Sequence, residues 1–278
     1  MMINEPATLE RLRDVCAGDG QRLDLVEAAL TLSRLRRAEP IDLAPFRQHV
    51  ATMAAELADL VRRRGAAPEQ LAEIVARSYG YRGDSESYDD LQNADLVRVI
   101  ERRKGLPVAL SILYLALARQ QGWTAEGLAF PAHFLIRIGI DGARHVVDPF
   151  HDGMVRDAAD LRGLLRQVMG PEAELDPQHF DPVSDRDVLL RLENNVRLRL
   201  SQREDWAAAV QSVDRMLAIA PARTELLFEA GQLNARLDKR RAAIAAFDRF
   251  LAAPARQTDP ALRRRAEALL QELRRGLN

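Results

Sequence analysis

Apolar residues recur every three or four positions along residues 8–64, and this spacing predicts a helical N-terminal part. One apolar stripe runs from Leu23 to Leu35, and Pro40 separates it from a second helix. We expect the second helix to end at 62–65, where three arginines precede a glycine, because basic residues favour a helix C-terminus and glycine favours the left-handed position after it. A further helix begins near Pro68, with proline in its first turn.

The most apolar segment of the chain spans residues 107–120. It begins at Pro107, and Gly122 follows its end. Apolar residues occupy almost every side of this predicted helix, so we expect it to be buried on most sides.

Strand patterns follow the central helix. Residues 124–130 and 133–140 predict two strands, and residues 144–148 predict a third that returns antiparallel. Asp141-Gly142 is a strong signal for a two-residue hairpin turn, and its register places His133 opposite Phe150, with Asp148 diagonally across. We therefore predict an α+β fold that is mostly helical, with the central helix packed on a small antiparallel sheet.

An internal repeat occupies the C-terminal part. Residues 206–217 match residues 240–251 at an offset of 34, with an Asp-Arg pair in register. Thirty-four residues is the tetratricopeptide period. We predict one domain over residues 1–186 and tetratricopeptide-like helical repeats with a capping helix over residues 187–278. Such repeats expose extended concave surfaces for binding, so we expect a protein or peptide partner there.

Composition narrows the classes of function. With 40 basic and 41 acidic residues, the formal net charge is -1, and we expect no direct nucleic-acid binding because such proteins carry a concentrated basic face. Cys16 is the single cysteine, which excludes an intrachain disulfide and a cysteine-rich metal site. The sequence has no run near the ~20 apolar residues of a membrane span and no signal-peptide pattern at its start, so we expect no membrane association and a cytoplasmic location.

Three segments carry a family resemblance: Gly105-x-Pro107 with Ser111, Phe130-Pro131-x-His133-Phe134-Leu135-x-Arg137, and Asp148-Pro149-Phe150. Together they resemble the transglutaminase-like (papain-fold) superfamily. With the repeat region, they are similar to the bacterial transglutaminase-like family labelled regulator of sirC expression, an invasion-gene regulator label, over nearly the whole chain. The resemblance implies that the catalytic Cys, His and Asp positions of the superfamily fall on Pro107, His133 and Asp148.

Catalysis of the superfamily type needs a thiol at the N-terminus of the central helix, where the helix dipole acidifies it, a His to take the proton and an Asp to orient the His. Proline at position 107 supplies neither a thiol nor a backbone N–H, so we do not expect thiol chemistry. We interpret Cys16 as a buried small apolar residue and Ser111, one turn deeper in the helix, as a core residue.

Two interpretations of His133 and Asp148 stay open: a retained acid/base pair that lines a pocket, or a hydrogen bond that holds the hairpin against the helix. His145, His151 and Asp152 add possible ligands nearby. Their spacing is not a recognised ligand pattern, so we expect no metal and no cofactor.

Four residues upstream are candidates for ligand binding. Arg102 and Arg103 precede the N-terminus of the central helix and would bind an acidic ligand there, although a solvated helix end is the alternative. Tyr81 and Arg82 belong to a polar and aromatic segment that would either rim a cleft or pack under a loop.

From these patterns and the resemblance we expect a non-catalytic transglutaminase-like protein with tetratricopeptide repeats that acts as a protein-binding or regulatory module. One alternative is a residual hydrolase or transferase that uses His133 and Asp148 with a water molecule or Ser111. The other is a transcriptional regulator that acts indirectly, through protein contacts.

Overall fold

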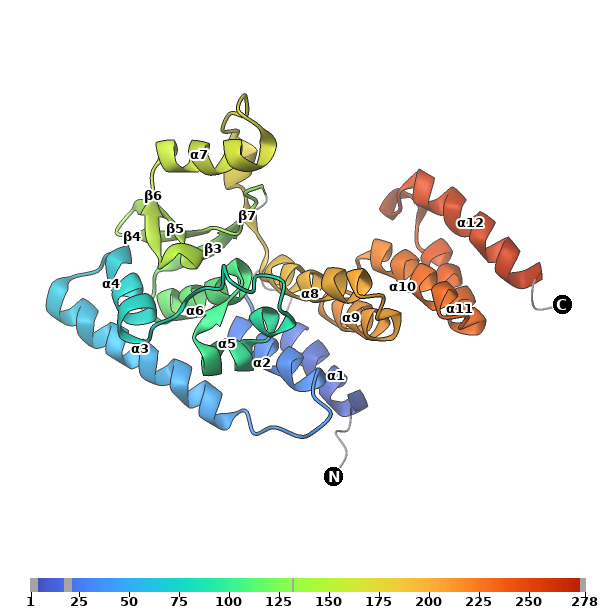
Figure 1. The fold of residues 1–278 in the computed structure, drawn as a ribbon, viewed down its shortest axis with the longest axis horizontal. Coiled ribbons are helices and arrows are strands. Elements are labelled where there is room, and N and C mark those ends of the chain that lie inside the picture. The colour runs from blue at the N-terminus through green and yellow to red at the C-terminus, as the bar shows by residue number, and fades with distance from the viewer. Residues whose placement is uncertain (1–4, 18–21, 132, 276–278) are drawn as a thin grey trace. The chain divides into compact units, whose positions relative to one another are not determined.

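The computed structural model describes residues 5–17, 22–131 and 133–275. The chain divides into two compact units, Met1–Leu192 and Glu193–Asn278. Figure 1 shows that the first unit combines helices with a small sheet, whereas the second contains helices. None of the helices in the described ranges has the length and apolar character needed to cross a membrane.

The N-terminal helices form where the apolar stripes predict them. They start at capping residues: the Asp24 carboxylate accepts a hydrogen bond from Glu27 N at 2.9 Å, and Pro68 occupies a first-turn position. The helix that begins at Pro68 changes into a π-helix after Ala72. The elements are α1 (Glu5–Cys16), α2 (Leu25–Leu35), α3 (Ala44–Arg64), α4 (Pro68–Ala72), the π-helix η1 (Glu73–Ser78), the 3-10 helix η2 (Leu91–Ala94) and α5 (Leu96–Arg102).

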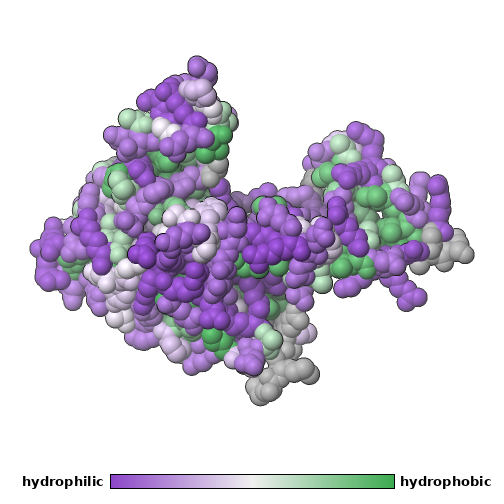
Figure 2. All heavy atoms as spheres, in the orientation of Figure 1, coloured by the Kyte–Doolittle hydropathy of each residue, from purple (hydrophilic) through white to green (hydrophobic). Residues whose placement is uncertain are grey.

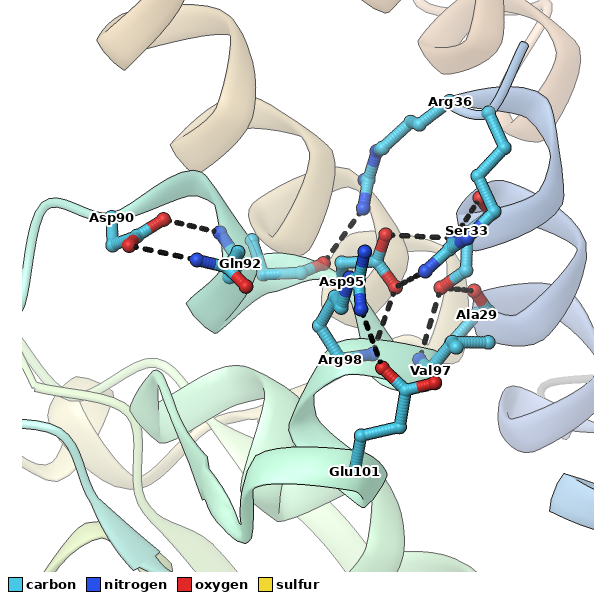
Figure 3. A network of polar contacts seen from close by, with 11 residues as sticks. Ala29, Ser33, Arg36, Asp90, Gln92, Asp95, Val97, Arg98 and Glu101 are labelled. Carbon is cyan, nitrogen blue, oxygen red and sulfur yellow. Dashed lines mark hydrogen bonds and ion pairs between the residues drawn. The ribbon is translucent and has the colours of Figure 1, made fainter. Parts of the chain in front are cut away.

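A polar network ties α2 to the start of α5 (Figure 3). The Ser33 hydroxyl donates to Ala29 O at 3.0 Å and accepts from Val97 N at 3.3 Å. Arg36 donates to Ala94 O at 2.8 Å, and Arg37 forms an ion pair with Asp95. These bonds satisfy backbone groups at the N-terminus of α5 and fix the segment that leads to the central helix.

The central helix is α6 (Pro107–Gln120), which has the predicted bounds. Eleven of its 14 residues are buried, as its apolar sides predict. A short parallel pair of strands precedes it, β1 (Arg82–Gly83) and β2 (Lys104–Gly105), with Gly83 opposite Gly105.

A five-stranded sheet packs beside α6 in the order β6-β5-β4-β3-β7. Asp141 and Gly142 both have positive φ, at 50° and 84°, as a type I′ hairpin turn requires. Ile136 pairs with Val147 in the predicted register. The strands are β3 (Thr124–Leu128), β4 (Ile136–Ile140), β5 (Ala143–Asp148), β6 (Met154–Arg156) and β7 (Pro182–Val183), with the 3-10 helix η3 (Pro149–His151) between β5 and β6.

Strand β4 begins three residues later than predicted, because the backbone N–H of His133 turns back to Pro131 O at 2.7 Å instead of joining the ladder. On one face of the sheet, Leu161 and Leu165 of α7 (Ala158–Met169) pack against Leu128 and Leu135. The fold is therefore the predicted mostly helical α+β architecture, with the central helix α6 beside a small antiparallel sheet.

The second unit consists of antiparallel helix pairs. Helices α9 (Trp206–Ile219) and α11 (Arg240–Ala252) start 34 residues apart, which confirms the predicted period. Gly231 is required where α10 (Thr224–Arg236) meets α11, because a Cβ there would lie 2.5 Å from the Phe247 ring. α8 (Asp185–Gln202) leads into this unit, and α12 (Pro260–Arg275) ends it.

Hydrophilic side chains cover most of the molecular face drawn in Figure 2, with smaller apolar areas between them. Among the described residues, a few large apolar side chains are exposed, and such positions are candidates for contact with partners. They are Tyr88, Met154, Val155, Val168, Met169 and Leu198.

Candidate functional site

Asp148 is the centre of the candidate site. It is the last residue of β5, and its side chain is completely buried. Its Oδ1 atom accepts hydrogen bonds from Phe150 N at 3.2 Å and His151 N at 3.3 Å, so the carboxylate caps η3 and turns the chain toward β6.

Two histidine side chains and one arginine side chain contact this carboxylate. His133 Nε2 lies 2.9 Å from Oδ1, and His151 Nδ1 lies 2.8 Å from Oδ2. Arg156 of β6 donates to Oδ2 at 2.9 Å. The side chains of His133 and His151 are 15% and 45% exposed, so both imidazoles reach the surface while the carboxylate does not.

Electrostatics keep Asp148 ionised. Burial opposes the charged form, but the hydrogen bonds and charges of His133 and His151 outweigh it and hold the pKa of Asp148 below its ordinary value. The carboxylate is thus a permanent anion near neutral pH that orients two imidazole rings.

The site lies on the side of the molecule where α6 begins. The His133 and Phe150 rings meet edge to face with their centroids 6.2 Å apart. Phe150 in turn packs directly on Gly83, where an added Cβ would lie 2.5 Å from the ring. Gly83 is paired with Gly105, two residues before Pro107. These contacts connect the His133–Asp148 pair to the N-terminus of α6, through Phe150 and the short strands β1 and β2.

The chain places no thiol at that N-terminus. Pro107 is the first residue of α6, and the Ser111 hydroxyl donates to Pro107 O at 2.7 Å in the buried interior of the helix. Cys16 is buried in α1, where burial raises the pKa of its thiol to about 11. A thiol with that pKa is almost entirely protonated at neutral pH and is a poor nucleophile.

The cluster contains a possible set of metal ligands, because one donor atom each from His133, Asp148 and His151 lies within 4.8 Å of the others. Two imidazoles and a carboxylate suit zinc or iron(II). Here, however, both carboxylate oxygens already accept several hydrogen bonds, and the positive charge of Arg156 lies beside Oδ2. A cation would have to displace that arginine, so the geometry favours an enclosed anion over a metal centre.

The candidate binding residues do not form one cluster. Arg102 donates to Asp84 Oδ2 at 3.0 Å, which is a separate ion pair. Arg103 has a left-handed backbone, with φ 61°, and its guanidinium contacts the hydroxyl of the buried Tyr81 and His49 Nε2. Burial, with the Arg103 charge, lowers the pKa of His49. Arg102, Arg103 and Tyr81 thus make intramolecular contacts.

Arg82 is placed differently from the other three candidates. Its side chain is exposed, and it lines a pocket of about 520 Å³ that also includes Asp152–Val155. Ligand binding by any of the four residues stays a prediction.

Sequence reasoning did not place His151 and Arg156 on Asp148. The position of His151 could have been predicted from Asp148-Pro149 at the end of a strand. An aspartate cap there turns the chain so that the residue three positions later, His151, folds back onto the carboxylate. No comparable signal existed for Arg156, because the three-residue strand that carries it has no recognisable alternation.

Comparisons with known proteins agree with this architecture. Residues 44–194 match the family described as the transglutaminase-like superfamily, and residues 196–271 match the tetratricopeptide repeat. The first match covers more than half of the chain. The chain belongs to the transglutaminase-like superfamily and carries tetratricopeptide repeats after its core.

Its relatives confirm the narrower resemblance to the bacterial family labelled regulator of sirC expression. A UPF0162 protein of Xylella fastidiosa (strain Temecula1) is 30% identical over 239 residues, which are 84% of this chain and 85% of that protein. Protein SirB1 of Salmonella typhimurium is 24% identical over 174 residues, 61% of this chain and 64% of that protein. Human F-box only protein 21 is 34% identical over 167 residues, 56% of this chain but 25% of that longer protein.

Proposed function

We propose that this protein is a non-catalytic, protein-binding regulatory module of the cytoplasm, with residues 1–186 as an inherited enzyme-like core and residues 187–278 as the partner-binding region. The observation that carries the proposal is Pro107 in the first turn of α6. A proline has no nucleophile and no backbone N–H, so the helix N-terminus lacks both the attacking group and one donor for a developing oxyanion. The single free thiol, Cys16, suits a reducing compartment.

The repeat region supplies the binding surface in this proposal. Tetratricopeptide helices bury their apolar stripes against each other and expose the remaining side chains for recognition. In this unit Leu198 of α8 is 44% exposed. The preceding residue, Arg197, forms an ion pair with Glu229 of α10, which links the two helices.

The experiment is capture of partners from lysate by the full-length protein and by two full-length variants. Leu198→Glu places a charge on the proposed surface. Gln211→Glu adds the same charge at an exposed position of α9 and is the matched control. We expect specific partners to be retained by the wild type and by Gln211→Glu and lost by Leu198→Glu. Identical partners for all three proteins would contradict binding at this surface.

A residual hydrolase or transferase is the second candidate. The hydrogen bond of 2.9 Å between His133 and Asp148, together with the partial exposure of His133, favours it, because an oriented imidazole can activate water. In that case His133→Ala would abolish a hydrolytic activity, whereas the binding proposal expects it to leave partner capture unchanged.

A further inference from the structure

Strand β6 forms an open edge of the five-stranded sheet. It pairs with β5 through Val155 opposite Val147, and its other side has no neighbouring strand among the described residues. Met154 and Val155 are 53% and 38% exposed, although consecutive strand residues point to opposite faces. An exposed apolar edge with unpaired backbone groups is a template for another strand unless something covers it.

A groove of about 520 Å³ runs along this edge. Its wall opposite β6 is the face of α4 and η1, which Figure 1 shows close to the sheet. That wall presents Ala72, Ala76 and Gly80, which are small enough to let a peptide backbone approach. The wall follows residues 69–80 of α4, η1 and the turn after them, so an extended chain of a few residues can run along it.

The two ends of the helical wall carry opposite charges. Glu69 and Arg77 both line the groove and are exposed, and neither forms an ion pair in the part of the chain that the structure describes. By contrast, the neighbouring Glu73 is paired with Arg64 at 2.7 Å. Arg77 lies eight positions after Glu69, through α4 and the more compact π-helix η1, so the two residues are at most roughly 12 Å apart along the axis, up to three to four residues of a strand. Arg82 and Asp152, both exposed, add one further positive and one further negative charge to the lining.

The groove has a fixed floor. Gly153 has φ 72°, and a Cβ there would lie 2.6 Å from the Tyr114 hydroxyl of α6, so the turn before β6 packs directly on the buried helix. A rigid edge costs little ordering free energy when a peptide binds.

We propose that this groove binds an extended segment of a partner protein, which adds to β6 as a further strand. The segment has an apolar side chain facing Val155 and Ala76, with a basic residue toward Glu69 and an acidic residue three or four positions away toward Arg77. Backbone hydrogen bonds to β6 give affinity, and the charges select one strand direction. This surface belongs to the first unit and is independent of the binding proposed for the repeats.

A displayed random library of nine-residue peptides, panned against the full-length protein, tests the proposal. Enriched peptides are then titrated against the wild type by fluorescence anisotropy and mapped by hydrogen exchange. We expect peptides with an apolar residue between an acid and a base, and slowed amide exchange at 154–156. Ala76→Glu, which fills the groove, should weaken binding at least tenfold, whereas Ala51→Glu on the exposed side of α3 is the matched control and should not.

The double variant Glu69→Lys/Arg77→Glu changes only exposed side chains and keeps the proposal testable if Ala76→Glu does not fold. The double variant should bind the selected peptides at least tenfold more weakly than the wild type does. It should instead bind peptides in which the acidic and basic residues are exchanged. Failure to enrich any peptide would overturn the proposal. Enriched peptides that bind both variants as tightly as the wild type, or that leave exchange at 154–156 unchanged, would also overturn it.

Discussion

His133 Nε2 lies 2.9 Å from Oδ1 of Asp148, a carboxylate that is completely enclosed by the protein. The same carboxylate accepts hydrogen bonds from His151, Arg156 and two backbone N–H groups. A buried anion with this many donors organises the end of β5, η3 and β6 at once, whether or not the imidazoles do chemistry. Its removal would leave the Arg156 charge without its partner.

Asp148→Asn should therefore lower the free energy of unfolding by about 3 kcal/mol, as expected when one partner of a buried ion pair is lost. Denaturation with urea measures the change. Asp152→Asn is the control, because Asp152 is exposed and asparagine tolerates its left-handed backbone, with φ 54°. Equal stabilities of the two variants would show that the carboxylate is not a structural centre.

The contribution of Asp148 should depend on pH. Its pKa is lowered in the folded state, so its stabilisation is fully present above the ordinary carboxyl pKa of about 4 and is lost as pH falls through the lowered value. The difference in unfolding free energy between wild type and Asp148→Asn should thus shrink between pH 4 and the acid limit of the native state. A difference that stays constant on acidification would contradict a lowered pKa.

Cys16 should react slowly with a thiol reagent in the native protein. Burial raises the pKa of its thiol to about 11, so at pH 8 both access and thiolate fraction are low. Reaction with a chromogenic disulfide should be slow in buffer and fast in denaturant, where the thiol is free. Rapid labelling of the native protein would mean that Cys16 is an accessible nucleophile.

The turn before β6 should not accept a side chain. Gly153→Ala introduces a Cβ next to the Tyr114 hydroxyl at a positive φ, whereas Gly142→Ala has a similar φ but no atom within 4 Å. We expect Gly153→Ala to be more destabilising by about 1–3 kcal/mol, the usual effect of overpacking. Thermal unfolding compares the two.

A second substitution tests the part of the clash that involves the Tyr114 hydroxyl. The Tyr114 hydroxyl has no hydrogen-bond partner among the residues that the structure describes, so Tyr114→Phe alone should be close to neutral or stabilising. Combined with Gly153→Ala, it should restore part of the lost stability. No restoration would show that contact with the hydroxyl does not dominate the loss, because the added Cβ would also lie 2.8 Å from a carbon of the Tyr114 ring.

The sequence allowed much of the core to be predicted, because local patterns define it. The bounds of α6 follow from Pro107 and a continuous apolar run, and the hairpin register follows from Asp141-Gly142. The 34-residue offset identified the repeat helices for the same reason. Each of these signals is contained in a short stretch of sequence or in a sequence repeat.

The remaining parts of the site depend on backbone details that no local pattern encodes. Arg102 and Arg103 are adjacent in the sequence, but the left-handed backbone at Arg103 turns its side chain to Tyr81 while Arg102 pairs with Asp84. Arg156 reaches Asp148 only because a three-residue strand returns along β5.

The central claim is that this chain binds a partner through its repeats and does not modify it. Calorimetric titration of a captured partner into full-length wild type, Leu198→Glu, Gln211→Glu and His133→Ala, with the mass of the partner measured afterwards, tests it most directly. We predict at least tenfold weaker binding for Leu198→Glu, unchanged binding for the other two variants and an unchanged partner mass. A partner whose mass is altered by the wild type but not by His133→Ala would contradict the claim and establish an enzyme.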